Sequence, residues 1–390
     1  MSKVHIALVG GQPTPVYQGA VLSQPDRIIL ICSAQTKDKA CIIQGKLKDL
    51  KYFNVSVEVF PIEDVKAIIN KLEILLSTIS QEDTISMNLS SGVKIWALLC
   101  MQLCTQETAH IYCLSQNGMI LNIRGISEQK QVAFDMFTQF ILLGHPLENY
   151  TNFSDYGITE KQNHDYIEHL YHRKEFHSLL NRMQQEKQTM EKDKLDYLAE
   201  DRTVEIDDNH YIDWDVKDKV FAISLGCKGN DYFEVKGEHA PSMLLNTGWF
   251  EYEVATYLAE IYGVDNVYMN CVFKSEQSTS KFNDKNEVDV IVNTGQKLLF
   301  VECKTKITNI TDIDKFASVV RNYGGDGSKS LFVTMFEMNE QQKEKCNDNK
   351  IANYYTHYTS KGKFGYSQEN VITSSKMKQR ILDFLYTAND

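Results

Sequence analysis

The chain has 390 residues, of which 43% are hydrophobic and 24% charged, a balance that excludes a disordered protein and suits two or three globular domains. No apolar run approaches the roughly 18 residues of a membrane-spanning helix, so we expect a cytoplasmic protein with no membrane partner. The formal charge of −11 falls entirely in residues 147–390, because residues 1–146 hold 12 basic and 12 acidic side chains. An acidic half argues against a nucleic-acid partner, since phosphates are usually bound by a basic surface.

The first 145 residues alternate between strand-like and helix-like patterns. Apolar runs predict strands at His5–Gly10, Arg27–Cys32, Val55–Phe60, Thr84–Leu89, His110–Ser115 and Met119–Arg124. Helical periodicity lies between them, at Lys37–Tyr52, Val65–Ile79 and Val93–Cys104. This alternation predicts an α/β, Rossmann-like domain in which a parallel sheet is covered on both faces and binds ligands beyond the carboxyl ends of its strands.

Two polar loops lie at such strand ends. The first contains Gly11, Gln12 and Thr14, and the second contains Asn88, Ser90, Ser91, Gly92 and Lys94. The second loop opens a helix, whose N-terminal backbone N–H groups favour an anion, and the ammonium of Lys94 can contact a phosphate. The alternative is that the serines only cap the helix.

The middle of the chain carries no recognisable chemistry. A helix over 128–145 should stop before Pro146, residues 159–200 read as polar helices, and residues 202–235 read as short strands. We interpret 146–235 as a connector or dimer arm. His169 and His172 lie one helical turn apart there and could hold a metal, but we favour a solvated helix face as their explanation. The nine cysteines suit buried free thiols in a reducing cytosol.

From residue 246 the pattern predicts an α/β/α core with a central hairpin. Its expected elements are a helix at Trp249–Ile261, strands at Asn266–Phe273, Glu287–Val292 and Lys297–Lys304, a helix at Ile310–Asn322, a strand at Ser330–Met335 and closing helices. A turn at 293–296 would pair Glu287 with Glu302 and Asp289 with Phe300. Period two then places Glu287, Asp289, Glu302 and Lys304 on one face of the hairpin.

Three carboxylates and one lysine on a shared face would repel one another without a counter-charge. A divalent cation removes that cost, and oxygen ligands favour Mg²⁺ or Mn²⁺. Glu251 or Glu253 on the preceding helix could add a ligand or a base. A solvated strand face with alternating charges is the alternative, and the apolar residues flanking the motif argue against it. Locally, residues 274–329 hold nine basic and eight acidic side chains, so nucleic acid is not excluded there.

This order of helix, hairpin, Glu-x-Lys and helix resembles the PD-(D/E)xK nuclease fold over residues 246–335. The resemblance implies that Asp289, Glu302 and the backbone carbonyl of Cys303 bind metal and that Lys304 is catalytic.

The second N-terminal loop resembles the Asn-x-Thr-Gly-Gly-Thr-Lys motif of CARF domains, which sense cyclic oligoadenylates in type III CRISPR immunity. Asn88, Gly92 and Lys94 match that motif, whereas Ser91 replaces a glycine and Val93 a threonine. The loop Gln12-Pro13-Thr14-Pro15 resembles the first ligand loop of effectors that combine a CARF and a nuclease domain. The resemblance implies a CARF domain at 1–145, a connector at 146–235 and a nuclease domain at 236–390. It also implies a homodimer with one ligand across its two-fold axis, cyclic tetra-adenylate in preference to the hexa-adenylate.

The sequence therefore favours a metal-dependent endonuclease that a cyclic oligoadenylate activates in antiviral defence and that cuts DNA and RNA, single strands above all. Two alternatives remain open. One is a ligand sensor without enzymatic activity, such as a transcriptional regulator, although no helix-turn-helix with a basic recognition helix is evident. The other is a ring nuclease that degrades its own ligand. Ring size, substrate strandedness, metal preference and resting oligomer are not determined by the sequence.

Overall fold

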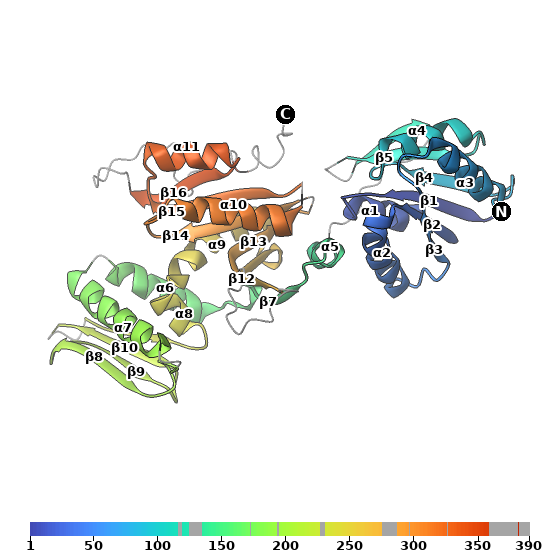
Figure 1. Ribbon diagram of the computed structural model, residues 1–390. Coiled ribbons are helices and arrows are strands. Elements are labelled where there is room, and N and C mark those ends of the chain that lie inside the picture. Colours follow the sequence, from blue (N-terminus) through green and yellow to red (C-terminus); the bar gives the residue numbers. More distant parts are fainter. Residues whose placement is uncertain are drawn as a thin grey trace.

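The computed structural model describes residues 1–115, 119–124, 135–171, 173–192, 195–226, 231–274, 287–295, 297–325, 327–358 and 381. Three sheets organise this part of the chain. Figure 1 shows the N-terminal sheet at one end of the molecule, the second six-stranded sheet in the middle and a four-stranded sheet at the other end. Helix α5 (Met136–Leu143) lies between the first two sheets.

The N-terminal sheet has the strand order β3-β2-β1-β4-β5-β6. Its strands are β1 (Lys3–Val9), β2 (Arg27–Cys32), β3 (Val55–Val59), β4 (Thr84–Asn88), β5 (His110–Leu114) and β6 (Ile120–Arg124). Strands β1 to β5 are parallel, and β6 runs antiparallel to β5. The expected strands are confirmed to within a residue or two at each end.

Four helices cover the two faces of this sheet, namely α1 (Thr14–Ser23), α2 (Lys37–Asp49), α3 (Val65–Ser77) and α4 (Lys94–Leu103). One core cluster joins α1 and α2 to one face, and another joins α3 and α4 to the opposite face. Helix α1 was not anticipated, because Pro13, Pro15 and Gly19 interrupt its apolar pattern. The strand order reverses between β1 and β4, which is where open parallel sheets bind ligands.

The second sheet has the order β16-β15-β14-β13-β12-β7. Its strands are β7 (Leu147–Asn152), β12 (Val267–Phe273), β13 (Glu287–Asn293), β14 (Leu298–Lys304), β15 (Lys329–Phe336) and β16 (Ala352–Tyr358). Helix α9 (Gly248–Tyr262) packs on one face and α10 (Thr311–Gly324) on the other. This is the expected α/β/α core with a central hairpin.

The closing part of this domain differs from the expectation of helices alone. Helix α11 (Glu340–Asp348) is followed by β16, which pairs in parallel with β15 and extends the sheet. The segment 352–358 is rich in tyrosine and threonine, and such residues favour strands once a sheet edge is available. Any helices expected between 359 and 380 lie outside the described residues.

The four-stranded sheet is an antiparallel meander of β8 (Arg202–Asp207), β9 (His210–Asp215), β10 (Val220–Leu225) and β11 (Tyr232–Lys236). Helices α6 (Ile158–Leu170), α7 (Lys174–Lys192) and α8 (Ala240–Leu245) pack against it. A single hydrophobic cluster continues from this sheet to the second six-stranded sheet. The short strands expected at 202–235 are confirmed, and they belong to a packed structure, whereas β7 from the same expected connector joins the second sheet.

Candidate active site and ligand loops

The β13–β14 hairpin carries the expected motif, but its register differs from the expectation by two residues. Ile291 pairs with Phe300 and Asn293 with Leu298, so the pairing of Asp289 with Phe300 was wrong, as was that of Glu287 with Glu302. The reason is the turn, which holds the four residues 294–297 and closes with a hydrogen bond from the Thr294 amide to the Lys297 carbonyl. An even shift leaves each side chain on its original face.

Asp289, Glu302 and Lys304 come together at one end of this hairpin. The Lys304 Nζ lies 2.8 Å from Glu302 Oε1 and 3.9 Å from Asp289 Oδ2. The backbone amide of Cys303 donates a hydrogen bond of 2.7 Å to Asp289 Oδ2. These contacts fix the carboxylate of Asp289 between β13 and β14, beside the Glu-x-Lys pair.

The alternation of faces along β13 is interrupted at Asp289. Val288 packs in the core cluster of α10, whereas Val290 packs in the cluster of α9, although residues two apart on a regular strand share a face. The neighbouring strand β12 changes face at the same level, around Asn270, which has a φ of 51°. Period two therefore does not carry Glu287 onto the face of Asp289, and Glu287 is exposed.

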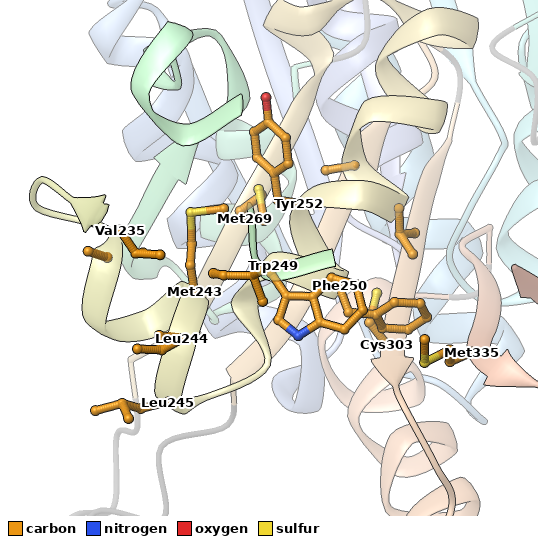
Figure 2. Packing of buried hydrophobic residues seen from close by; sticks show 14 of the residues in the cluster. Val235, Met243, Leu244, Leu245, Trp249, Phe250, Tyr252, Met269, Cys303 and Met335 are labelled. Carbon is orange, nitrogen blue, oxygen red and sulfur yellow. The ribbon is translucent and has the colours of Figure 1, made fainter. Parts of the chain in front are cut away.

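Glu251 is brought to the site by α9. It lies in the first turn of that helix, directly after Trp249 and Phe250, which are buried. Figure 2 shows Phe250 beside Cys303 and Met335, so the start of α9 is packed onto β14 and β15. Burial raises the pKa of Glu251 well above its ordinary value, and the charge of Asp289 adds to the effect.

Glu253 has a different environment from Glu251. Its carboxylate accepts a hydrogen bond of 3.1 Å from the Tyr257 hydroxyl. Burial raises the pKa of Glu253 to about 7, and the charge that adds to this rise is that of Glu168 on α6. Glu251 is therefore the residue of the pair that shares an electrostatic environment with Asp289.

The site concentrates negative charge in a buried place. Burial and the neighbouring Asp289 raise the pKa of Glu302 to about 7, and burial also raises the pKa of Asp289. Burial opposes the charge of Lys304, but Asp289 and Glu302 raise the pKa of its ammonium above the ordinary value. One ammonium faces three half-buried carboxyl groups, so the ionised set lacks a counter-charge.

The chemistry of these donors fits a hard divalent cation such as Mg²⁺ or Mn²⁺. In the described parts of the chain, no three His, Cys, Asp or Glu side chains are already arranged around a common point as metal ligands. The thiol of Cys303 belongs to the apolar cluster beneath α9, on the face of β14 opposite to its neighbours Glu302 and Lys304. A role for the Cys303 carbonyl as a ligand stays a prediction.

The two polar loops of the N-terminal sheet are packed directly on each other. The Gly10 amide donates a hydrogen bond of 3.1 Å to Ser91 Oγ. A Cβ atom added at Gly10 would lie 2.4 Å from the Gly92 nitrogen, and Gly92 itself has a φ of 88°. Both glycines are thus required for the loops to meet at the point where the strand order reverses.

Residues 238–352 match the family model of the Card1-like endonuclease domain. The matched segment contains α9 and the β13–β14 hairpin, and with them Asp289, Glu302 and Lys304.

Three solved structures share the fold of the chain. Can2 from Sulfobacillus thermosulfidooxidans, solved in complex with cyclic tetra-adenylate, is 15% identical with a TM-score of 0.67, over 99% of this chain and 100% of that one. Protein VC1899 from Vibrio cholerae is 14% identical with a TM-score of 0.69, over 98% of both chains. A type III CRISPR defence DNA nuclease activated by cyclic oligoadenylate is 14% identical with a TM-score of 0.58, over 98% of this chain and 52% of that one. No curated protein matches the chain in sequence.

These findings confirm the expected fold class, a Rossmann-like CARF domain followed by an α/β/α endonuclease domain. They also confirm the resemblance of the chain to effectors that combine a CARF and a nuclease domain.

In the CARF domain, part of the expected ligand set serves the loops themselves. The buried Asn88 donates from Nδ2 to the Pro15 carbonyl over 2.8 Å, and its Oδ1 accepts from the Ser90 amide over 3.0 Å. The Ser90 hydroxyl accepts a hydrogen bond of 2.7 Å from the Leu114 amide and donates one to Asn88. Asn88 and Ser90 therefore shape the second loop, and their direct contact with a ligand stays a prediction.

The remaining expected ligand residues are more accessible. Gly11 and Lys94 are exposed, with Lys94 the first residue of α4, while Gln12 and Thr14 are half-buried. Lys39 of α2, which the sequence did not single out, donates from Nζ to the Gly11 carbonyl over 2.8 Å. It adds an ammonium beside the first loop, and no motif marks it among the lysines of α2.

The other expectations concern the cysteines, the paired histidines and the membrane. The described cysteines are free thiols, and six of them are buried: Cys32, Cys100, Cys104, Cys271, Cys303 and Cys346. His169 lies against the Phe233 ring at 5.8 Å between centroids, whereas His172 and Cys227 lie outside the described residues. Among the described helices, none has the length and apolar character to cross a bilayer.

Proposed function

We propose that this chain is a metal-dependent endonuclease that a cyclic oligoadenylate activates. The observation that carries the proposal is the group of half-buried Glu251, Asp289 and Glu302 around Lys304, in a segment that matches the Card1-like endonuclease domain. Asp289 and Glu302 would hold Mg²⁺ or Mn²⁺, with Glu251 as a further ligand or base. Glu287, exposed but close enough for its charge to raise the pKa of Glu251 and Asp289, would act at longer range.

Phosphodiester hydrolysis needs a nucleophilic water and stabilisation of the charge that develops on the phosphoryl oxygens. A bound divalent cation supplies acidity to a water and polarises the phosphate. Lys304 is held in place by Glu302 and Asp289, so its ammonium can stabilise the developing charge without reorganising first. The Cys303 amide fixes the orientation of Asp289, which keeps the carboxylate directed at the same point.

The activator would bind at the two loops of the CARF domain. Can2, of the same fold, was solved with cyclic tetra-adenylate, and a second structure of this fold is described as a DNA nuclease activated by cyclic oligoadenylate. Two copies of the chain would present Gly11, Gln12, Thr14, Ser91 and Lys94 twice around a two-fold axis. A four-fold ring contains that axis, as a six-fold ring does, and we propose the tetra-adenylate.

The proposed substrates are DNA and RNA, with single strands favoured, as part of antiviral defence of the CRISPR type. In the described part of the endonuclease domain no helix with a basic face stands ready to read base edges, so we expect little sequence preference. A single strand reaches a site at the end of a hairpin with less deformation than a duplex does.

The test is cleavage of labelled single- and double-stranded DNA and RNA, with Mg²⁺ or Mn²⁺, with and without cyclic tetra- or hexa-adenylate. Wild type should cut only with both metal and ligand, and Glu302→Gln should not cut. Glu234→Gln, an exposed glutamate on β11, is the matched control and should cut like wild type. Full activity of a folded Glu302→Gln would refute the proposed site. Chromatography of the ligand recovered from the same samples distinguishes a ring nuclease from the proposed endonuclease. In a ring nuclease, Glu302→Gln would still consume the ligand.

A further inference from the structure

Helix α5, with the sequence Met-Phe-Thr-Gln-Phe-Ile-Leu-Leu, is apolar except for Thr138 and Gln139, and its apolar residues lie on more than one side. A helix of that kind is buried on more than one side. Phe140 belongs to the core cluster of the endonuclease domain, whereas Leu142 belongs to the cluster of β1, α1 and α2 in the CARF domain. Both side chains are almost fully buried. The helix is therefore shared by the two domains as a common core element.

On the endonuclease side, α5 holds the C-terminal end of α10. The buried side chain of Gln139 donates a hydrogen bond of 3.0 Å from Nε2 to the Gly324 carbonyl. The Phe140 ring lies 5.0 Å from that of Phe273 and 6.2 Å from that of Phe300. A Cβ atom added at Gly325 would lie 3.5 Å from Leu143 Cδ1. The end of α10 is thus positioned by Gln139 and Leu143.

On the CARF side, α5 touches the helix that begins in the first ligand loop. Helix α1 packs against α5, and the Thr138 side chain lies near enough to the Tyr17 hydroxyl to oppose the rise that burial causes in its pKa. Helix α1 starts at Thr14, a proposed ligand residue. The same loop also approaches the end of α10 directly, since a Cβ atom added at Gly325 would lie 3.9 Å from Gln12 Oε1. Loop, α5 and α10 therefore meet at one junction.

The opposite end of α10 acts on the active site. Asp312, in its first turn, is one of the charges that bear on Glu302. Between the two ends, Ile313, Phe316 and Val320 pack in the core cluster that contains Phe300 and Phe332 of β14 and β15. A packed helix of this length moves as one body, so a displacement of Gly324 is carried to Asp312 and to the strand that bears Glu302.

We infer that α5 couples ligand binding in the CARF domain to the endonuclease site, with Gln139 as the positioning residue that sets α10. This inference rests on the proposed function. Ligand bound at the first loop stabilises one placement of α5, and the same placement stabilises the active arrangement of α10. Gln139 is not one of the proposed metal ligands or ligand residues, and it acts through its hydrogen bond to Gly324.

The test uses Gln139→Met in the full chain, because methionine keeps the volume of glutamine and removes the donor. Gln184→Met is the matched control, since Gln184 Nε2 also donates to a backbone carbonyl, that of Leu245, at 3.1 Å and away from the CARF domain. The readouts are the ratio of cleavage rates with and without cyclic tetra-adenylate, the Kd of that ligand, the Kd of Mn²⁺, and the melting temperature. Leu143→Ala is the second variant of the same junction.

Gln139→Met should lower the activation ratio about tenfold or more, the effect that one buried hydrogen bond can have, while both dissociation constants stay within about threefold of wild type. Gln184→Met should keep the wild-type ratio. An unchanged ratio in both Gln139→Met and Leu143→Ala would overturn the inference alone. A wild type that no cyclic oligoadenylate stimulates would overturn the proposed function and the inference with it. Loss of ligand binding or of folding in Gln139→Met, with a normal ratio in Leu143→Ala, would also count against it.

Discussion

Lys304 is the residue on which the charge balance of the site depends. Its ammonium lies 2.8 Å from Glu302 and 3.9 Å from Asp289, whereas no second cation is among the groups that bear most on Glu251. Removing Lys304 leaves three half-buried carboxyl groups beside one another without that counter-charge. Removing one carboxylate relieves that repulsion but takes away a proposed ligand. The two kinds of variant should therefore differ in stability while both lose activity.

Lys304→Met should cut at least about 100-fold more slowly than wild type, because the ammonium that stabilises the developing charge is lost. Glu302→Ala and Asp289→Ala should lose at least as much, because each removes a proposed metal ligand. Initial rates at saturating Mn²⁺ and ligand measure this. A rate within about threefold of wild type in a folded Lys304→Met would contradict the role given to the lysine.

The pKa of Glu302, raised to about 7, also makes a prediction for stability. An acid whose pKa is higher in the folded than in the unfolded state is stabilising below its unfolded pKa and loses that contribution as the pH rises through the folded pKa. Without metal, wild type should therefore lose stability between about pH 4.5 and 7 relative to Glu302→Gln. In thermal melts without metal, Glu302→Gln should raise the melting temperature above that of wild type by more at pH 8 than at pH 5. When Mn²⁺ is added, wild type should have the higher melting temperature of the two proteins. Equal gains at both pH values would contradict the charged, buried state of this residue.

At the scale of elements, the parallel strands of the CARF domain follow from their apolar runs, because burial on both faces leaves a continuous signal. The endonuclease hairpin is harder. Its apolar residues locate both strands, but the register depends on the residue at which the four-residue turn begins, and the sequence suits a start at Asn293 as well as at Thr294. The change of face at Asp289 depends on the left-handed backbone of Asn270, a distant residue on another strand. Such long-range causes leave no local pattern.

The N-terminal end of α4 is the element that should bind a phosphate of the activator. Lys94→Ala should weaken binding of cyclic tetra-adenylate by about tenfold or more, because an exposed ammonium at a helix N-terminus adds its charge to that of the free amides. Isothermal titration measures the Kd, and Lys66→Ala, an exposed lysine on α3, is the control. Mn²⁺ binding should be unaffected. Identical ligand affinities in the two variants would exclude Lys94 from the ligand site.

For the whole molecule, the proposal places a single ligand between two chains. Titration should therefore saturate at one cyclic tetra-adenylate for every two chains, and the active species should have the mass of a dimer in light scattering. A stoichiometry of one ligand per chain, or full activity from a monomer, would contradict this arrangement. Either result would leave the endonuclease site as described and would require a different account of activation.

One hydrophobic cluster runs without a break from Val204 and Ile212 of the four-stranded sheet to Val290 and Val333 of the endonuclease sheet. Regions that share a core melt cooperatively, so the four-stranded sheet should not unfold before the endonuclease domain. The CARF domain has two clusters of its own and meets the rest at α5. Scanning calorimetry should therefore resolve two heat-absorption peaks, and the smaller one should move to higher temperature when the activator is added. A third peak would show that the shared core does not join those two sheets into one cooperative unit.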